Sequence, residues 1–109
     1  MANIRIVLAD DHAVVRAGLR NALTGRQDLD VVAEVGNGPD LLAAVRELLP
    51  DLIVIDVAMP DFEPVSAVRT FKTEHPTMRI LVVSAYADEG YLVGLLGAGV
   101  DGYHLKDQP

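Results

Sequence analysis

Short apolar runs alternate with longer amphipathic runs along the whole chain. Apolar residues are nearly continuous at 4–9, whereas in 13–24 they recur every three or four positions, so the pattern predicts a strand followed by a helix. The same alternation predicts strands at 31–35, 52–55, 80–83 and 102–105, and helices at 39–49, 64–75 and 88–98. Five short apolar strands separated by helices are typical of a parallel α/β sheet that is covered on both faces.

Composition narrows the class of protein. The 109 residues suffice for one domain with a single core, and half of them are hydrophobic, which excludes a disordered tail. A formal net charge of −7, with the basic residues scattered, argues against nucleic acid binding by this domain alone. The absence of cysteine excludes disulfides and thiolate metal sites. The sequence shows no signal-peptide pattern and no apolar run of membrane-spanning length, so a cytoplasmic protein is expected.

Polar residues stand at the ends of four predicted strands. They are Asp10, Asp11, Asp56, Ser84 and Lys106. The carboxyl ends of parallel strands converge on one crevice, so we expect these side chains to lie close together. Three carboxylates, a hydroxyl and an ammonium in one crevice are what a magnesium-assisted phosphoryl transfer onto an aspartate needs.

Each of these residues also has a simpler structural explanation. Asp11 is placed to cap the helix that starts near residue 13, and Asp56 is of a type that commonly begins a turn. Ser84 and Lys106, taken singly, read as a turn hydroxyl and a solvated terminal lysine. Their joint placement at strand ends is what favours the chemical interpretation. His12 and His75 have no Cys or His partner at ligand spacing, so we interpret both as surface or loop histidines.

Four sequence segments resemble the receiver domain of two-component response regulators, in particular the NarL/FixJ (LuxR-type) subfamily. They are Leu-Ala-Asp-Asp-His-Ala-Val-Val-Arg-Ala-Gly-Leu at 8–19, Asp-Val-Ala-Met-Pro at 56–60, Val-Ser-Ala at 83–85 and Gly-Tyr-His-Leu-Lys-Asp at 102–107. The resemblance covers essentially the whole chain, in the expected order. It implies a flavodoxin-like (CheY-like) doubly wound sheet with strand order 2-1-3-4-5.

The resemblance also implies a phosphorylation site. Asp56 would be the phosphoacceptor, and a sensor histidine kinase would be the phosphoryl donor. Magnesium would be held by Asp10, Asp11, Asp56 and the backbone carbonyl of Ala58. The domain would not be an enzyme in the usual sense, because it would accept the phosphoryl group on itself.

The same resemblance implies a switch. Ser84 and Lys106 would bind the phosphoryl group, and the side-chain rotamer of Tyr103 would follow the movement of Ser84. The surface of the fourth helix and fifth strand would then change for an output domain that controls transcription. Tyr86, two residues beyond Ser84, would overhang the site and slow attack by water; an ordinary exposed aromatic is an equally good interpretation.

The chain departs from the family pattern after Met59-Pro60. Members usually have Gly-x-Asp/Asn-Gly at this point, and this chain has Asp61-Phe62-Glu63-Pro64. Loss of the glycines removes easy access to positive φ, although Asp61 tolerates that region better than most residues and Pro64 suits a helix start. Asp61 and Glu63 also add negative charge. We therefore predict an altered magnesium affinity, kinase docking or phosphorylation rate.

The second departure is the end of the sequence. A typical receiver continues past the lysine into a fifth helix, whereas this sequence stops at Pro109. We expect residues 1–109 to be a receiver domain truncated before that helix, from a longer regulator that binds DNA through an absent output domain. Apolar surface on the first and fifth strands would favour a homodimer or other self-association.

Two other classes of function remain open. A phosphorylation-independent pseudo-receiver would keep the fold and signal by dimerisation, which the altered loop after Pro60 allows. A flavin or nucleotide binder of similar fold is less favoured, because the first loop offers Asp-Asp where phosphate binding needs glycines or hydroxyls.

Overall fold

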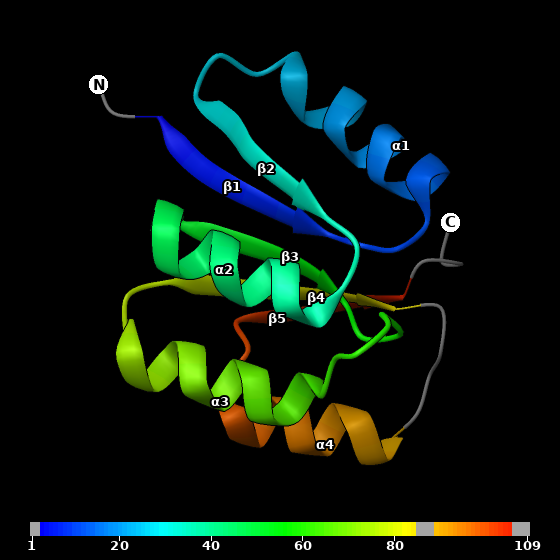
Figure 1. Ribbon diagram of the computed structural model, residues 1–109, viewed down its shortest axis with the longest axis vertical. Coiled ribbons are helices and arrows are strands. Elements are labelled where there is room, and N and C mark those ends of the chain that lie inside the picture. The colour runs from blue at the N-terminus through cyan, green and yellow to red at the C-terminus, as the bar shows by residue number, and fades with distance from the viewer. Residues whose placement is uncertain (1–2, 85–88, 106–109) are drawn as a thin grey trace.

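The structure is a five-stranded parallel sheet in the order β2-β1-β3-β4-β5 (Figure 1). The computed structural model describes residues 3–84 and 89–105. The elements in chain order are β1 Ile4–Ala9, α1 Ala13–Thr24, β2 Leu29–Val35, α2 Gly38–Leu48, β3 Leu52–Asp56, α3 Pro64–Glu74, β4 Arg79–Ser84, α4 Glu89–Ala98 and β5 Gly102–Leu105. Both the fold class and the strand order predicted from the sequence are confirmed.

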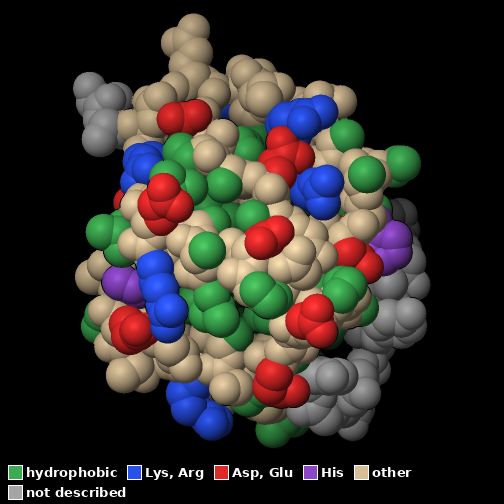
Figure 2. Space-filling view, in the orientation of Figure 1, with side chains coloured by type: hydrophobic (Ala, Val, Ile, Leu, Met, Phe, Trp, Pro, Cys, Tyr) green, Lys and Arg blue, Asp and Glu red, His purple; other side chains and the backbone are tan. Residues whose placement is uncertain are grey.

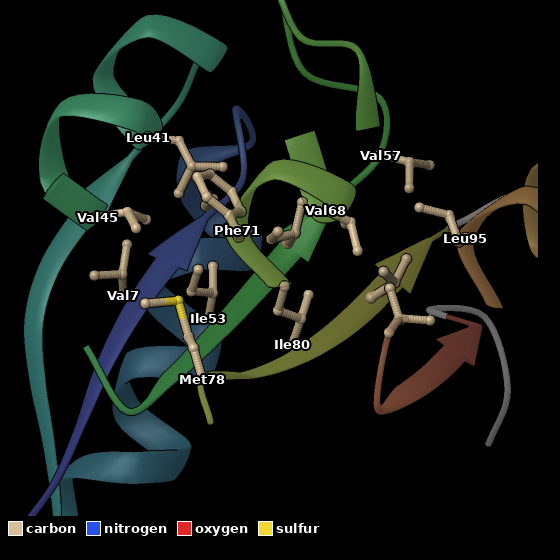
Figure 3. Close-up of a cluster of buried hydrophobic side chains, with 14 of the residues drawn as sticks. Val7, Leu41, Val45, Ile53, Val57, Val68, Phe71, Met78, Ile80 and Leu95 are labelled. Carbon is tan, nitrogen blue, oxygen red and sulfur yellow. The ribbon is translucent and has the colours of Figure 1, made fainter. Parts of the chain in front are cut away.

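Side chains alternate between the two faces of the sheet, and each face carries its own core. Val7 and Ala9 of β1 belong to the larger core, which α2, α3 and α4 cover, whereas Ile6 and Leu8 pack with residues of α1 on the opposite face. Figure 3 shows Phe71 of α3 at the centre of the larger core, between Leu41 of α2 and the strands. The strands are apolar on both faces because both faces are buried, which accounts for the continuous apolar runs.

The element boundaries agree with the sequence pattern except at β2. This strand starts at Leu29 instead of residue 31, because Leu29 and Asp30 pair with Ile4 and Arg5. Further along, the register shifts between Ile6 and Val7. The shift adds one residue to β2 relative to β1, as in a β-bulge. The sequence pattern missed the first two residues of β2 because the polar Asp30 interrupts the apolar run.

The outer surface shown in Figure 2 carries charges of both signs among apolar side chains. This agrees with the scattered basic residues of the sequence. In the part of the chain that the structure describes, every helix is too short or too polar to cross a bilayer.

Candidate functional site

Buried polar side chains gather at the carboxyl edge of the sheet. Within residues 3–84 and 92–104, the buried polar or charged side chains are those of Asp10, Asp56 and Ser84. Asp10 directly follows β1, Asp56 is the last residue of β3 and Ser84 is the last residue of β4. Burial of a carboxylate costs free energy unless other groups compensate for it. Two buried aspartates at adjacent strand ends make this edge of the sheet the candidate site.

Four side chains form a compact cluster at this edge. One potential ligand atom from each of Asp10, Asp11, His12 and Asp56 lies within 4.8 Å of the others. The structure thus brings together the three carboxylates that the sequence places at strand ends. Adjacent carboxylates repel one another, so their convergence favours a cation between them.

The turn after β1 fixes the position of Asp10. Its Oδ1 accepts a hydrogen bond from the backbone N–H of His12 at 2.8 Å, and its own N–H donates to the carbonyl of Val35 at 3.0 Å. The guanidinium of Arg16 donates to the backbone carbonyl of Asp10 at 2.6 Å. Arg16 was not singled out in the sequence; the signal was its position one helical turn beyond His12, which faces it back toward this loop.

The N-terminus of α1 differs from the simple capping explanation. The residue at the N-cap is His12, in extended backbone, and its side chain makes no capping hydrogen bond. The suggestion that Asp11 caps this helix is therefore wrong, because Asp11 precedes the N-cap position. Its carboxylate instead lies 3.1 Å from Nδ1 of His12, within the acidic cluster.

His12 is the cluster member that sequence reasoning missed. It lies in a loop and its side chain is 62% exposed, as interpreted from the sequence. Its Nδ1, however, lies 3.2 Å from Oδ1 of Asp10, 3.1 Å from Oδ1 of Asp11 and 3.8 Å from Oδ2 of Asp56. The available signal was the unbroken Asp-Asp-His run at a strand end, because any loop that places the aspartates also confines the next residue.

Asp56 is oriented by the backbone that follows it. Its Oδ1 accepts a hydrogen bond from the N–H of Ala58 at 3.2 Å. This contact keeps Ala58 beside the carboxylate. Ala58 is the residue whose backbone carbonyl was predicted to be a metal ligand.

The loop after Pro60 folds without the glycines usual in the family. Asp61 adopts a φ of 53°, and Pro64 is the first residue of α3, so both residues behave as the sequence suggested. The loop rests on the start of α2, where the N–H of Gly38 donates to the carbonyl of Pro60 at 3.0 Å. A Cβ at Gly38 would lie 2.0 Å from the backbone oxygen of Asp61, so only glycine fits there.

The remaining sequence-predicted residues lie on the neighbouring strands or outside the described part. Ser84 is fully buried and pairs with Leu105 of β5, and the partly buried Tyr103 packs against the larger core. Lys106 and Tyr86 lie outside the described residues. Asp61 and Glu63 are both exposed on the loop before α3.

The donor set of the cluster fits a magnesium ion. Oxygen ligands are those that this hard cation prefers, and Asp10, Asp11 and Asp56 supply carboxylate oxygens from two strand ends. Positive charge at this point would also offset the repulsion among the three carboxylates.

Comparison with known protein families identifies the family to which the chain belongs. The model of the response regulator receiver domain matches residues 6–109. This chain is a member of the response regulator receiver domain family.

The curated relatives of this receiver domain include a transcriptional regulatory protein and response regulators. The domain is 36% identical over 104 residues to the uncharacterized transcriptional regulatory protein YhcZ of Bacillus subtilis. The aligned region covers 95% of this chain and 49% of the relative. The domain is 35% identical over 103 residues to the response regulator protein VraR of Staphylococcus saprophyticus, covering 94% of the chain and 49% of that protein. The chain thus spans about half the length of these curated relatives.

Solved structures agree on the fold. The signal receiver domain of the response regulator NarL from Mycobacterium tuberculosis superimposes with a TM-score of 0.90 at 28% identity, over 100% of this chain and 88% of that one. A LuxR-family response regulator from Aurantimonas gives a TM-score of 0.87 at 30% identity, over 98% of this chain and 76% of that one.

Proposed function

We propose that this receiver domain accepts a phosphoryl group on Asp56 from a phosphohistidine of a sensor histidine kinase. The observation that carries the proposal is the position of Asp56: a buried carboxylate at the end of β3, within 4.8 Å of two further aspartates. A carboxylate oxygen of Asp56 attacks the phosphorus, the P–N bond breaks, and the electron pair leaves with the imidazole nitrogen of the kinase. The product is an acyl phosphate on Asp56.

The residues around Asp56 have distinct parts in this transfer. The N–H of Ala58 restrains rotation of the carboxylate through Oδ1. Asp10, Asp11, Asp56 and the carbonyl of Ala58 hold Mg²⁺, which when bound neutralises negative charge on the transferring phosphoryl oxygens. The turn anchored by Arg16 and the His12 N–H keeps Asp10 in place for this purpose.

Ser84 and Lys106 are proposed to bind the phosphoryl group once it is formed. Val83 pairs with Asp56 across the sheet, so Ser84 lies one residue further along the adjacent strand. Its hydroxyl is a donor for a phosphoryl oxygen, and Lys106 follows directly after the β5 residue that pairs with Ser84. Movement of Ser84 would be followed by Tyr103 on β5, and Tyr86 would limit attack by water.

The phosphorylated domain is proposed to regulate transcription through a DNA-binding output domain outside residues 1–109. The apolar side chains of Val93 and Leu96 on α4 are exposed and provide a surface that the switch can change. Self-association is supported by an open groove of about 320 Å³, because apolar side chains, among them Val15, Leu19 and Val83, line it.

The loop change is proposed to slow phosphorylation without preventing it. The backbone reaches the positive φ at Asp61 without glycine, so the loop is formed, while Asp61 and Glu63 add exposed negative charge. An anionic phosphodonor would be repelled by these charges. The variants Asp61→Asn and Glu63→Gln should therefore be phosphorylated faster by acetyl phosphate than the wild type; equal rates would contradict this effect.

Intact-mass measurement after incubation with acetyl phosphate tests the proposal. The wild type should gain the mass of one phosphoryl group with Mg²⁺ and fail to gain it with a chelator. Asp56→Asn should gain nothing, whereas the control Asp28→Asn, which changes an exposed aspartate paired with Arg26, should behave as the wild type. No gain in the wild type would favour the phosphorylation-independent module.

A further inference from the structure

The imidazole of His12 lies where the carboxylates of the acidic cluster converge. Its Nδ1 is 3.1 Å from Asp11, 3.2 Å from Asp10 and 3.8 Å from Asp56. By contrast, the guanidinium of Arg26 at an exposed turn meets a single aspartate, Asp28. Nδ1 of His12 contacts three carboxylates from two strand ends, so it belongs to the cluster.

The ring is not engaged in holding the start of α1. His12 stands at the N-cap, where Ser, Thr, Asp or Asn would stabilise the helix through a side-chain hydrogen bond. The His12 side chain makes no such bond. Its backbone N–H donates instead to Asp10, and the ring Nδ1 lies 3.2 Å from the same carboxylate oxygen. The local structure therefore forgoes a cap and places an imidazole nitrogen beside oxygen ligands.

The spacing of these atoms suits ligands of one ion. Ligands with metal bonds of roughly 2.0–2.2 Å lie about 2.8–3.6 Å from their neighbours in octahedral or tetrahedral geometry. The Nδ1 distances to Asp10 and Asp11 fall in this range, and the distance to Asp56 lies just above it. Imidazole nitrogen binds first-row transition-metal ions, Mn²⁺ the most weakly among them, whereas Mg²⁺ strongly prefers oxygen.

We infer that His12 is a further protein ligand of this metal site and makes it select Mn²⁺ over Mg²⁺. The inference rests on the proposed metal site of the phosphoacceptor centre. His12 Nδ1 joins the carboxylates of Asp10, Asp11 and Asp56 when a transition-metal ion is bound, and contributes little to binding of Mg²⁺. The exposed remainder of the ring lets its other nitrogen stay in contact with water.

Electron paramagnetic resonance of the Mn²⁺-loaded protein tests this directly. Spin-echo modulation from a directly bound ¹⁴N should be present in the wild type and absent in His12→Ala. The matched control is His75→Ala, which removes the histidine that ends α3 and should keep the modulation. The wild-type spectrum is informative by itself, so the test does not depend on the folding of any variant.

Affinities measured by the same method give the selectivity. His12→Ala should weaken Mn²⁺ binding by about tenfold or more. Mg²⁺ binding, measured by displacement of Mn²⁺, should change by less than about threefold. Equal weakening for both ions would overturn the inferred selectivity.

The outcomes separate this inference from the proposed function. Mn²⁺ binding without nitrogen modulation, or modulation that persists in His12→Ala, would overturn the role of His12 while leaving the phosphoacceptor site standing. Failure of the wild type to bind either ion would overturn both. The mass gain on Asp56 remains an independent measure of phosphorylation.

Discussion

Two clusters of charged side chains at opposite edges of the same sheet are arranged in contrasting ways. At the amino edge, the carboxylate of Asp101 meets Lys72 at 3.2 Å and Arg79 at 3.5 Å, and accepts the N–H of Ile80 at 2.8 Å. At the carboxyl edge, three carboxylates converge on His12. At the amino edge, one carboxylate contacts two cationic side chains. At the carboxyl edge, one imidazole contacts three carboxylates.

The contrast distinguishes a structural use of aspartate from a chemical one. Asp101 joins α3 to the starts of β4 and β5, so it holds together segments that meet at the amino edge. Its charge is balanced within the protein. The carboxyl-edge cluster concentrates negative charge, an arrangement that would favour an added cation over the stability of the fold alone.

The backbone near each cluster is also held differently. The amino edge is tied by the Asp101 side chain, and the carboxyl edge by close packing of Gly38 on the loop at Asp61. Side-chain ties tolerate adjustment, whereas backbone atoms in contact have little room to move.

The largest effect is expected for Gly38→Ala. The added methyl group would lie 2.0 Å from the oxygen of Asp61, so the loop or α2 must move, at a cost of about 3 kcal/mol in the free energy of unfolding. The control is Gly18→Ala in α1, where a methyl group meets no atom within 4 Å. That change should stabilise the protein by up to about 1 kcal/mol through helix propensity. Urea unfolding measures both, and equal effects would mean that the contact is not tight.

Asp101→Ala should cost about 1–2 kcal/mol. It leaves the N–H of Ile80 and the ammonium of Lys72 without this acceptor, although partial exposure of the cluster limits the loss. Asp28→Ala removes the acceptor of an exposed pair with Arg26 and should have a much smaller effect. If urea unfolding shows the same loss in the free energy of unfolding for both variants, Asp101 does not stabilise the contacts among α3, β4 and β5.

The same kind of substitution should act in the opposite direction at the carboxyl edge. Asp11→Asn removes one of three like charges, so in a chelator it should raise the free energy of unfolding by about 0.5–1 kcal/mol. Added Mg²⁺ should stabilise the wild type more than the variant, because binding to the folded state adds to stability. Thermal unfolding with and without Mg²⁺ checks both signs. A loss of stability in chelator would show that the fold depends on this carboxylate.

The sequence predicts one of these clusters much better than the other. Asp10, Asp56 and Ser84 could be placed together because the carboxyl ends of parallel strands must share an edge once the order of elements is known. Asp101 carries no such signal, since its partners come from α3 and the start of β4 and their meeting depends on tertiary packing. His12 was missed for a related reason: the contact of its ring with three carboxylates from two strand ends depends on tertiary packing.

The contact between Gly38 and Asp61 marks another limit of sequence reasoning. The positive φ at Asp61 and the helix start at Pro64 follow from residue preferences and were anticipated. The need for glycine at 38 comes from a second loop that is distant in sequence. Local propensity accounts for the shape of each loop, and only the assembled sheet shows that the loops touch.

The smallest expected effect is the contribution of Asp101 to stability in acid. Burial would raise the pKa of this carboxyl, but the hydrogen bonds from Ile80 and Lys72 and the charges of Lys72 and Arg79 together hold its pKa below the usual value. A lowered folded-state pKa means that the contribution is complete above the unfolded pKa of about 3.9 and is lost as the pH falls through the folded value. Because the group is partly exposed, this contribution should be under about 1 kcal/mol.

Urea unfolding of wild type and Asp101→Asn between pH 6 and strongly acidic pH, about 2, measures that contribution. The stability difference between them should be constant above about pH 4 and should shrink below it. Salt at about 1 M should reduce the part due to Lys72 and Arg79 and leave the part due to the Ile80 hydrogen bond. A difference that stays constant down to the lowest pH would mean that the Asp101 tie does not depend on its charge, and the contrast between the two clusters would then lie in hydrogen bonding alone.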